Sequence, residues 1–190
     1  VLELGYVPVA IFYPLFFRRR AMLVTNMDGL EWKRSKWNRL LQRFARLTEL
    51  LGARCSDALI ADNEAIRDYL REEYGRDSRF IPYGAAPVSG PDASHLEHYA
   101  VKPQAYFMLI ARLEPENNIE IILDGYLESG DTRPFLVVGK TSTVYGAKLV
   151  AKYADSPRIH FLGGIYDYAV LSSLRWQAAI YFHGHSVGGT

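Results

Sequence analysis

Eight short apolar runs, separated by segments with helical periodicity, constrain the fold of this 190-residue chain more than any other feature. The runs lie at residues 1–6, 22–25, 58–61, 79–81, 106–111, 135–138, 159–162 and 178–182. Most are apolar on both faces, which is typical of parallel strands covered on both sides. Strands that alternate with helices predict βαβ units, and hence an α/β fold with doubly wound parallel sheets.

Three apolar stripes with spacings of three or four residues predict amphipathic helices. They are Leu40, Phe44, Leu47 and Leu51; Ile66, Leu70 and Tyr74; and Ile119, Ile122, Leu123 and Tyr126. Asp62 and Asn63 before the second stripe, and Asn117 before the third, are residue types that favour helix N-caps.

A stretch rich in glycine and proline separates the runs into two groups, and its composition indicates a linker. It contains Gly84, Pro87, Gly90, Pro91 and Pro103. We therefore expect one α/β domain over residues 1–86, a linker over 87–104 and a second α/β domain over 105–190. The chain starts in a strand-like run and stops in a loop, so we expect two incomplete domains from the interior of a longer protein.

The composition, 49% hydrophobic and 13% aromatic, is that of a globular protein with a core. The single cysteine excludes an internal disulfide, and no apolar run is long enough to cross a bilayer. Charge is uneven, because residues 18–54 hold 10 Lys or Arg against 3 Asp or Glu. This basic region indicates an anionic partner, namely phosphates, an anionic membrane or nucleic acid, or else a solvated helix face.

The segment from Tyr106 to Ile119 points most directly to a ligand. A buried strand delivers Arg112 at its carboxyl end, and a Pro-Glu-Asn-Asn turn then opens a helix. Ligands of open α/β sheets bind at the carboxyl ends of strands, where a helix N-terminus attracts anions and an arginine suits phosphate. The segment predicts half of a diphosphate site; the alternative is a capped helix with a surface arginine.

The terminal loop, residues 183–190, follows the last strand and is rich in glycine, which lets the backbone approach a ligand. His183 and His185 favour hydrogen bonding to a sugar or phosphate over metal binding, because no carboxylate or cysteine lies near them in the sequence. Lys140, in a Gly-Lys pair after the strand at residues 135–138, adds a cation at the same expected edge.

A dense polar cluster over residues 26–37 follows the second strand and contains Asp28, Glu31, Trp32 and Trp37. Indole faces stack on sugar rings and carboxylates accept hydroxyl protons, so the cluster predicts a carbohydrate pocket. The alternative is a helix start with both tryptophans in the core. Asp28 or Glu31 is also a candidate base. Dinucleotide, Walker A and serine-hydrolase motifs are absent from the sequence.

Several of these segments together resemble bacterial rhamnosyltransferases of glycosyltransferase family 4. They are residues 26–37, 61–63, 81–85, 111–118 and 183–190. The resemblance implies the GT-B architecture of two Rossmann-like domains, with the acceptor on the first and the nucleotide-sugar donor on the second. It also implies that Arg112 neutralises the donor diphosphate without a metal, while the cluster at residues 26–37 positions the acceptor.

The chain departs from the pattern of this family at three positions. Asn117 stands where the family has a lysine and Asn118 where it has a glycine, which leaves Lys140 as the candidate second cation. Gly188 stands where the first glutamate of a Glu-x7-Glu motif is usual, and the second would lie beyond Thr190. The ribose-binding glutamate is therefore missing, and we expect the chain alone to be inactive.

The resulting hypothesis is a cytoplasmic glycosyltransferase, working at the inner face of the membrane in surface polysaccharide synthesis and using dTDP-rhamnose as donor. The expected donor site is Arg112, Asn117, Asn118, Lys140, His183, His185, Ser186, Gly188, Gly189 and Thr190. The expected acceptor site is Asp28, Gly29, Glu31, Trp32, Arg34 and Trp37. We expect no metal, no further cofactor and no nucleic acid partner, but contact with anionic membrane through Arg18–Arg20. The competing hypothesis is a non-catalytic module that binds carbohydrate or lipid phosphate.

Overall fold

The chain folds into two compact units in a computed structural model, one formed by Val1–Ala85 and the other by Ala86–Ser186. The structure describes residues 2–5, 22–27, 29–33, 37–85, 87–88 and 91–186. Each of the eight expected apolar runs contains a strand or overlaps one. Both sheets are entirely parallel, as the two-sided hydrophobicity of the runs predicts.

Unit 1 contains a four-stranded sheet in the order β1-β2-β3-β4. Its strands are β1 (Leu2–Leu4), β2 (Val24–Met27), β3 (Ala58–Ala61) and β4 (Arg79–Phe80). Its helices are η1 (Glu31–Lys33), α2 (Arg39–Cys55) and α3 (Glu64–Tyr74). Side chains from β2, β3, α2 and α3 form the core, which consists of Met27, Ala53, Leu59, Ala61, Ile66 and Leu70.

Asparagine side chains begin both long helices of unit 1. The Asn38 carboxamide accepts a hydrogen bond from the Leu41 amide at 2.9 Å, and Asn63 accepts one from Ile66 at 2.8 Å. α3 ends at Gly75, which has the left-handed conformation (φ 63°) that glycine adopts without strain. The cap of α3 is therefore Asn63, while Asp62 lies one residue earlier in a buried position.

The apolar stripe of α2 faces outward, although its spacing resembles that of a core-facing stripe. Leu40, Phe44 and Leu47 are exposed. The buried residues of this helix are Thr48, Glu49, Gly52 and Ala53. Buried Glu49 accepts hydrogen bonds from the hydroxyls of Tyr69 and Tyr74, which join α2 to α3.

Unit 2 contains a four-stranded sheet in the order β7-β6-β5-β8. Its strands are β5 (Phe107–Ile110), β6 (Phe135–Val138), β7 (Ile159–Gly163) and β8 (Ile180–Phe182). Its helices are α4 (Ser94–Glu97), η2 (Pro115–Asn117), α5 (Ile119–Glu128), α6 (Val144–Lys152) and α7 (Tyr168–Gln177). This is the 3-2-1-4 order of a doubly wound Rossmann sheet, whose direction of winding reverses between β5 and β8.

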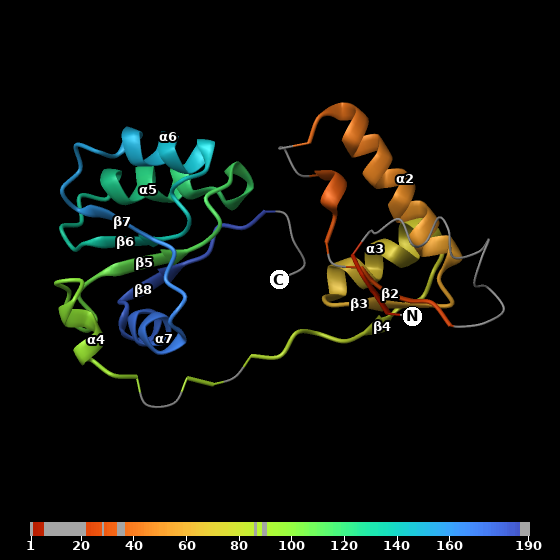
Figure 1. Cartoon of the computed structure of the whole chain (residues 1–190), viewed down its shortest axis with the longest axis horizontal. Helices are drawn as coiled ribbons and strands as arrows, with labels where there is room; N and C mark the ends of the chain where they lie inside the picture. The colour runs from red at the N-terminus through yellow and green to blue at the C-terminus, as the bar shows by residue number, and fades with distance from the viewer. Residues whose placement is uncertain are drawn as a thin grey trace. The chain divides into compact units, whose positions relative to one another are not determined.

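Helices cover both faces of the unit 2 sheet (Figure 1). α5 and α6 pack on one face around Phe107, Leu123, Phe135 and Leu149. α4 and α7 pack on the other around Leu96, Met108, Val138 and Leu174. The alternation of strand residues between two cores is the reason that these runs are apolar on both faces.

The linker expected over residues 87–104 is shorter in the structure. α4 lies within it, and Leu96 and Val101 are buried in the core that α7 covers. The Asp92 amide donates to the Ser173 hydroxyl at 3.0 Å, which ties this segment to α7. The glycine and proline residues at the start of the segment indicate a linker. The apolar residues in its second half pack on unit 2, which the composition does not reveal.

Candidate functional site

The carboxyl ends of β5 and β8 meet at the point where the strand order of unit 2 reverses. Arg112 follows β5 and His183 follows β8. In doubly wound sheets the crevice outside this switch point is the usual place for a ligand. The topology therefore brings two sequence candidates, distant along the chain, to the edge where ligands bind.

The turn after β5 is shaped by the side chain of Asn117. This residue is buried, and its carboxamide nitrogen donates to the Arg112 carbonyl oxygen at 2.6 Å. Asn118 then takes a left-handed conformation (φ 51°) and starts α5. The cap of α5 is thus Asn118, one residue later than the sequence pattern indicates. Asn117 holds the turn, and its role in donor binding stays a prediction.

The loop after β8 lies directly on this turn. The Asn118 carboxamide donates to the Gly184 carbonyl at 2.7 Å. The Glu116 carbonyl accepts hydrogen bonds from the Ser186 amide at 3.0 Å and from the Ser186 hydroxyl at 2.7 Å. An added Cβ at Gly184 would stand 2.6 Å from the Asn117 carbonyl oxygen, so only glycine fits this approach. The two predicted donor segments therefore form one continuous surface.

His183 and His185 stack against each other with ring centroids 4.0 Å apart and an interplanar angle of 20°. Burial lowers the pKa of His185, and the nearby His183 and Arg112 charges lower it further. Arg112 itself is exposed and has no ion-pair partner among the described residues. The site thus offers a free guanidinium beside two imidazoles, which suits an anionic ligand with further hydrogen-bonding groups.

Lys140 follows β6 at the same edge and is exposed. A Cβ on the neighbouring Gly139 would stand 2.2 Å from the Ala111 carbonyl oxygen, so β6 ends directly against the segment that leads to Arg112. The Thr143 hydroxyl accepts from the Gly146 amide at 2.9 Å and caps α6. Lys140 and the start of α6 therefore add positive charge to this edge.

The remaining predicted donor residues, Gly188, Gly189 and Thr190, lie outside the described residues. Among the part of the chain that the structure describes, no group of three His, Cys, Asp or Glu side chains is placed to hold a metal ion.

Fewer of the predicted acceptor residues can be placed. Asp28, Arg34 and the side chain of Glu31 lie outside what the structure describes, while Gly29 follows β2 with a positive φ of 77°. Trp32 is half-buried, and the guanidinium of Arg46 lies 5.1 Å from the centre of its ring. Trp37 is exposed just before α2. The two tryptophans thus occupy different environments, and the Trp32 ring already makes a cation–π contact with Arg46.

Three further polar side chains lie at the carboxyl edge of the unit 1 sheet. Asn26 is the penultimate residue of β2, Asp62 follows β3, and Tyr83 lies after β4. Asn26 donates to the Tyr83 hydroxyl at 3.4 Å, and Asp62 accepts from the Asn63 carboxamide at 3.1 Å. From the sequence, Asp62 is a candidate helix cap and lies in the segment 61–63 that resembles family 4 rhamnosyltransferases, but it is not among the expected site residues. Its position directly after an apolar strand was the signal that it lies at a ligand-binding edge.

The comparisons with known proteins agree with this fold. A family model for a domain of unknown function, DUF1972, matches residues 11–86, and no curated protein matches the chain. Among solved structures, sucrose-phosphate synthase from Thermosynechococcus elongatus superposes with a TM-score of 0.69 at 17% identity, over 93% of this chain and 47% of that one. Anabaena HepE in complex with UDP-glucose gives 0.67 at 18% identity, over 90% of this chain and 50% of that one.

The same fold also occurs in another class of enzyme. UDP-N-acetylglucosamine 2-epimerase from Rickettsia bellii superposes with a TM-score of 0.53 at 15% identity, over 95% of this chain and 50% of that one. The chain spans about half the length of each of these structures. Together they confirm the expected fold class, an α/β protein with two Rossmann-like units of the GT-B type. The resemblance to family 4 rhamnosyltransferases stays a prediction.

Proposed function

We propose that the protein is a glycosyltransferase that binds a nucleoside diphosphate sugar at the carboxyl edge of unit 2. The observation that carries this proposal is the docking of the His183–Ser186 loop onto the turn after Arg112, at the switch point of the sheet. HepE, which has this fold, binds UDP-glucose. In this proposal, unit 1 holds a glycan or lipid-linked acceptor at the edge that carries Asn26, Asp62 and the cluster at residues 26–37.

The charges at the unit 2 edge suit the departure of a diphosphate. Sugar transfer builds negative charge on the leaving diphosphate, and fixed cations and helix N-termini stabilise that charge without reorganising. Arg112 and Lys140 supply cations, and α5 and α6 begin beside them. The imidazoles of His183 and His185 supply hydrogen-bonding groups for the sugar or for phosphate oxygens.

We further propose that the donor is dTDP-rhamnose and that the product belongs to a surface polysaccharide made at the cytoplasmic face of the membrane. Support for these finer points comes from the resemblance of residues 26–37 and 183–190 to family 4 rhamnosyltransferases. A nucleotide without its sugar is the simpler first probe, because the diphosphate is common to all such donors.

The test is a calorimetric titration of the chain with UDP, dTDP and GDP, comparing the wild type with Arg112→Ala and Lys140→Ala. A hydrogen bond to a charged group contributes about 1.5–3 kcal/mol, so Arg112→Ala should weaken nucleotide binding by about tenfold to a hundredfold. Arg175→Ala is the matched control, because Arg175 is an exposed arginine on α7 of the same unit. Equal affinity of the Arg112→Ala variant and the wild type would overturn the diphosphate assignment.

Two competing functions give different results in the same experiments. An epimerase would convert UDP-N-acetylglucosamine to its 2-epimer without any acceptor, whereas a transferase requires one for glycosidic product. A non-catalytic module would bind glycan through Trp32 or Trp37 and leave nucleotide sugars unchanged. Product analysis of the reaction mixture, with and without acceptor glycan, separates the three.

A further inference from the structure

The outward surface of α2 carries two parallel rows of side chains. Arg39, Arg43 and Arg46 recur at intervals of four and three residues, and Arg54 continues their side of the helix. Leu40, Phe44, Leu47 and Leu51 recur with the same spacing, one residue later. Successive residues of a helix are offset by about 100°, so the cationic row and the apolar row lie side by side. We refer to them as the arginine row and the leucine row.

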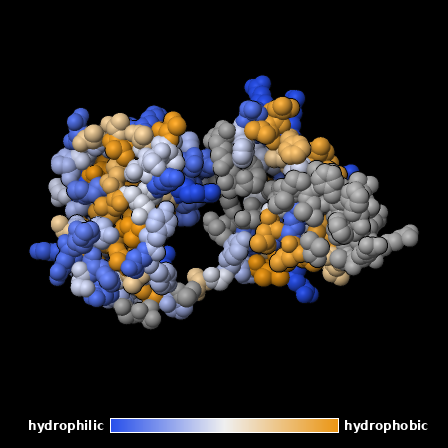
Figure 2. Space-filling view, viewed as in Figure 1, coloured by the Kyte–Doolittle hydropathy of each residue, from blue (hydrophilic) through white to orange (hydrophobic). Residues whose placement is uncertain are grey.

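The leucine row is open to solvent over the first half of the helix. Leu40 is 76% exposed, Phe44 52% and Leu47 51%. Figure 2 shows hydrophobic and hydrophilic side chains next to one another over α2. Monomeric soluble proteins rarely expose apolar side chains in such a contiguous row, so this face is suited to a partner.

The arginine row is largely unneutralised. Arg46 pairs with Glu73 at 2.8 Å, whereas Arg39, Arg43 and Arg54 have no ion-pair partner among the described residues. The only acidic residue of α2 is Glu49, which is fully buried and therefore absent from this face. The exposed surface of α2 thus combines positive charge with apolar side chains and contains no carboxylate of its own.

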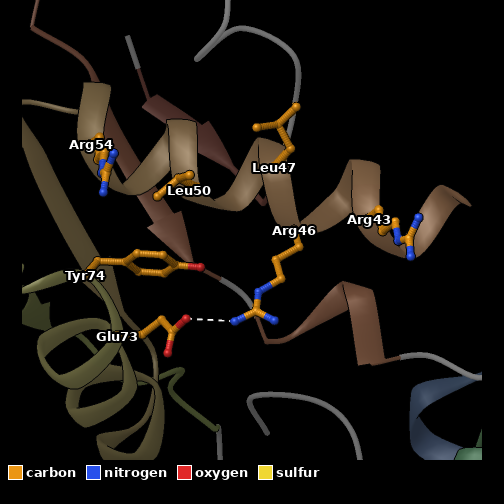
Figure 3. A pocket seen from close by; sticks show the side chains of 7 residues that line it. All are labelled: Arg43, Arg46, Leu47, Leu50, Arg54, Glu73 and Tyr74. Atoms are coloured by element: carbon orange, nitrogen blue, oxygen red, sulfur yellow. Dashed lines mark hydrogen bonds and ion pairs between the residues drawn. The ribbon is translucent and has the colours of Figure 1, made fainter. Parts of the chain in front are cut away.

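A groove of about 370 Å³ lies between α2 and the end of α3. Figure 3 shows Arg43, Arg46 and Arg54 along it, together with Leu47, Leu50, Tyr74 and Glu73, and Glu73 pairs with Arg46. Guanidinium groups beside leucine and tyrosine side chains fit a ligand that has a phosphate at one end and hydrocarbon at the other.

We propose that α2 docks on the surface of an anionic phospholipid bilayer. The leucine row enters the boundary of the acyl chains, and the arginine row binds headgroup phosphates, as in amphipathic helices that lie in the plane of the interface. No helix in the described part of the chain is long and apolar enough to span a bilayer, so this contact is peripheral. A second copy of the chain fits this face less well, because each copy would bring the same cationic row to the contact and no carboxylate of α2 to pair with it. α2 alone carries this proposal, which therefore stands whether or not the protein transfers sugars.

The test is flotation of the whole chain with vesicles, either of phosphatidylcholine alone or of phosphatidylcholine and phosphatidylglycerol in equal parts. Binding should require phosphatidylglycerol and should weaken as salt is added. Each arginine near an anionic surface contributes about fivefold, so the variant with Arg39→Gln and Arg43→Gln should partition about 25-fold less. Phe44→Ser combined with Leu47→Ser should abolish the binding that remains at high salt.

Matched controls lie in unit 2. Ile121, an exposed apolar residue on α5, becomes Ser, and Arg175, an exposed arginine on α7, becomes Gln; neither change should alter flotation. Circular dichroism checks that each variant is folded. If a double variant does not fold, the single variant Leu40→Ser, in the first turn of the helix, is used in its place. Light scattering reports whether a second copy covers the face.

Three results would overturn the proposal. The first is that the chain floats equally with both kinds of vesicle, or that it floats with neither kind. The second is loss of binding on substitution of Arg18–Arg20 while the α2 variants bind as the wild type does. The third is a dimer that dissociates in the Phe44→Ser and Leu47→Ser variant while flotation is unchanged.

Discussion

The side chain of Asn118 donates a hydrogen bond to the carbonyl oxygen of Gly184 at 2.7 Å. This bond connects the turn that follows β5 with the loop that follows β8, across 66 positions of sequence. The two strands flank the switch point of the unit 2 sheet, so the bond lies where a doubly wound fold places its ligand. A defect in this contact should therefore affect both the stability of unit 2 and its affinity for a nucleotide.

Gly184→Ala tests this contact. The added Cβ would stand 2.6 Å from the Asn117 carbonyl oxygen and 2.7 Å from the Ile122 side chain, so the loop must move away from the turn. Overpacking of this kind costs about 1–3 kcal/mol of unfolding free energy. Urea denaturation should show this loss, and calorimetry should show weaker nucleotide binding.

Gly125→Ala is the matched control, because Gly125 lies within α5 and has no atom within 4 Å of an added Cβ. Alanine favours the helix by up to about 1 kcal/mol, so this variant should be at least as stable as the wild type. A Gly184→Ala variant that matches the wild type in both measurements would show that the loop and turn are not coupled.

The pKa of His185 should respond to Arg112. Burial lowers this pKa below its ordinary value of 6.5, and the charges of His183 and Arg112 lower it further. Arg112→Gln removes one of these charges, so the pKa of His185 should rise in a titration followed by NMR of the ring protons. A bound nucleoside diphosphate should also raise it, since phosphate offsets the guanidinium charge. The Arg175→Gln variant should titrate as the wild type does, and an unchanged value in Arg112→Gln would refute the proximity of the two groups.

Tyr74→Phe should destabilise unit 1. The Tyr74 hydroxyl donates to the Glu49 carboxylate at 2.5 Å, and Glu49 is fully buried on α2. Removing one donor from a buried carboxylate costs about 1–3 kcal/mol, because Glu49 then keeps only the Tyr69 hydroxyl of its two tyrosine donors. Urea denaturation measures this cost. Tyr168→Phe, at a tyrosine that is largely exposed, should leave stability unchanged; an equal loss in both variants would contradict the role of Tyr74.

Stability should also fall at alkaline pH because of the same cluster. Burial and the hydrogen bond to Glu49 raise the pKa of Tyr69 to about 12, and similar causes raise that of Tyr74. A raised pKa means that the folded state holds its proton more tightly than the unfolded state, whose tyrosines titrate near 10. The contribution is therefore complete below pH 10 and is lost as the pH rises toward 12. Urea midpoints measured on both sides of pH 10 should decline less in Tyr69→Phe than in the wild type; an equal decline would refute this cause.

The sequence predicts the strands well, because an apolar run bounded by polar residues leaves few alternatives to a buried strand. Ala58–Ala61 and Phe135–Val138 have the bounds that the sequence indicates, and the other strands differ by a few residues. The order of the strands is a different matter. Nothing local distinguishes β8 as the neighbour of β5, since that pairing depends on α7 crossing to the opposite face of the sheet from α5 and α6.

For the candidate site, too, the sequence predicts the single residues but not how they are arranged. The sequence identifies Arg112 and His183 as candidates because each follows an apolar strand, and parallel strands end at one edge. It does not show that the two segments touch, or that Asn117 is buried as a structural element of the turn. These facts depend on hydrogen bonds between residues far apart in the chain.

The helix α2 shows most clearly what the sequence determines and what it leaves to the tertiary structure. Its 3.6-residue periodicity and the Asn38 cap establish that a helix forms. They do not establish which side is buried, because two sides of the helix show helical spacing. One is the leucine row, and the other contains Thr48, Glu49 and Gly52. The buried side is the one that places small residues against the sheet and gives Glu49 its two tyrosine partners from α3. An apolar stripe faces the core only where another element covers it, and here the sheet and α3 cover the opposite side of the helix.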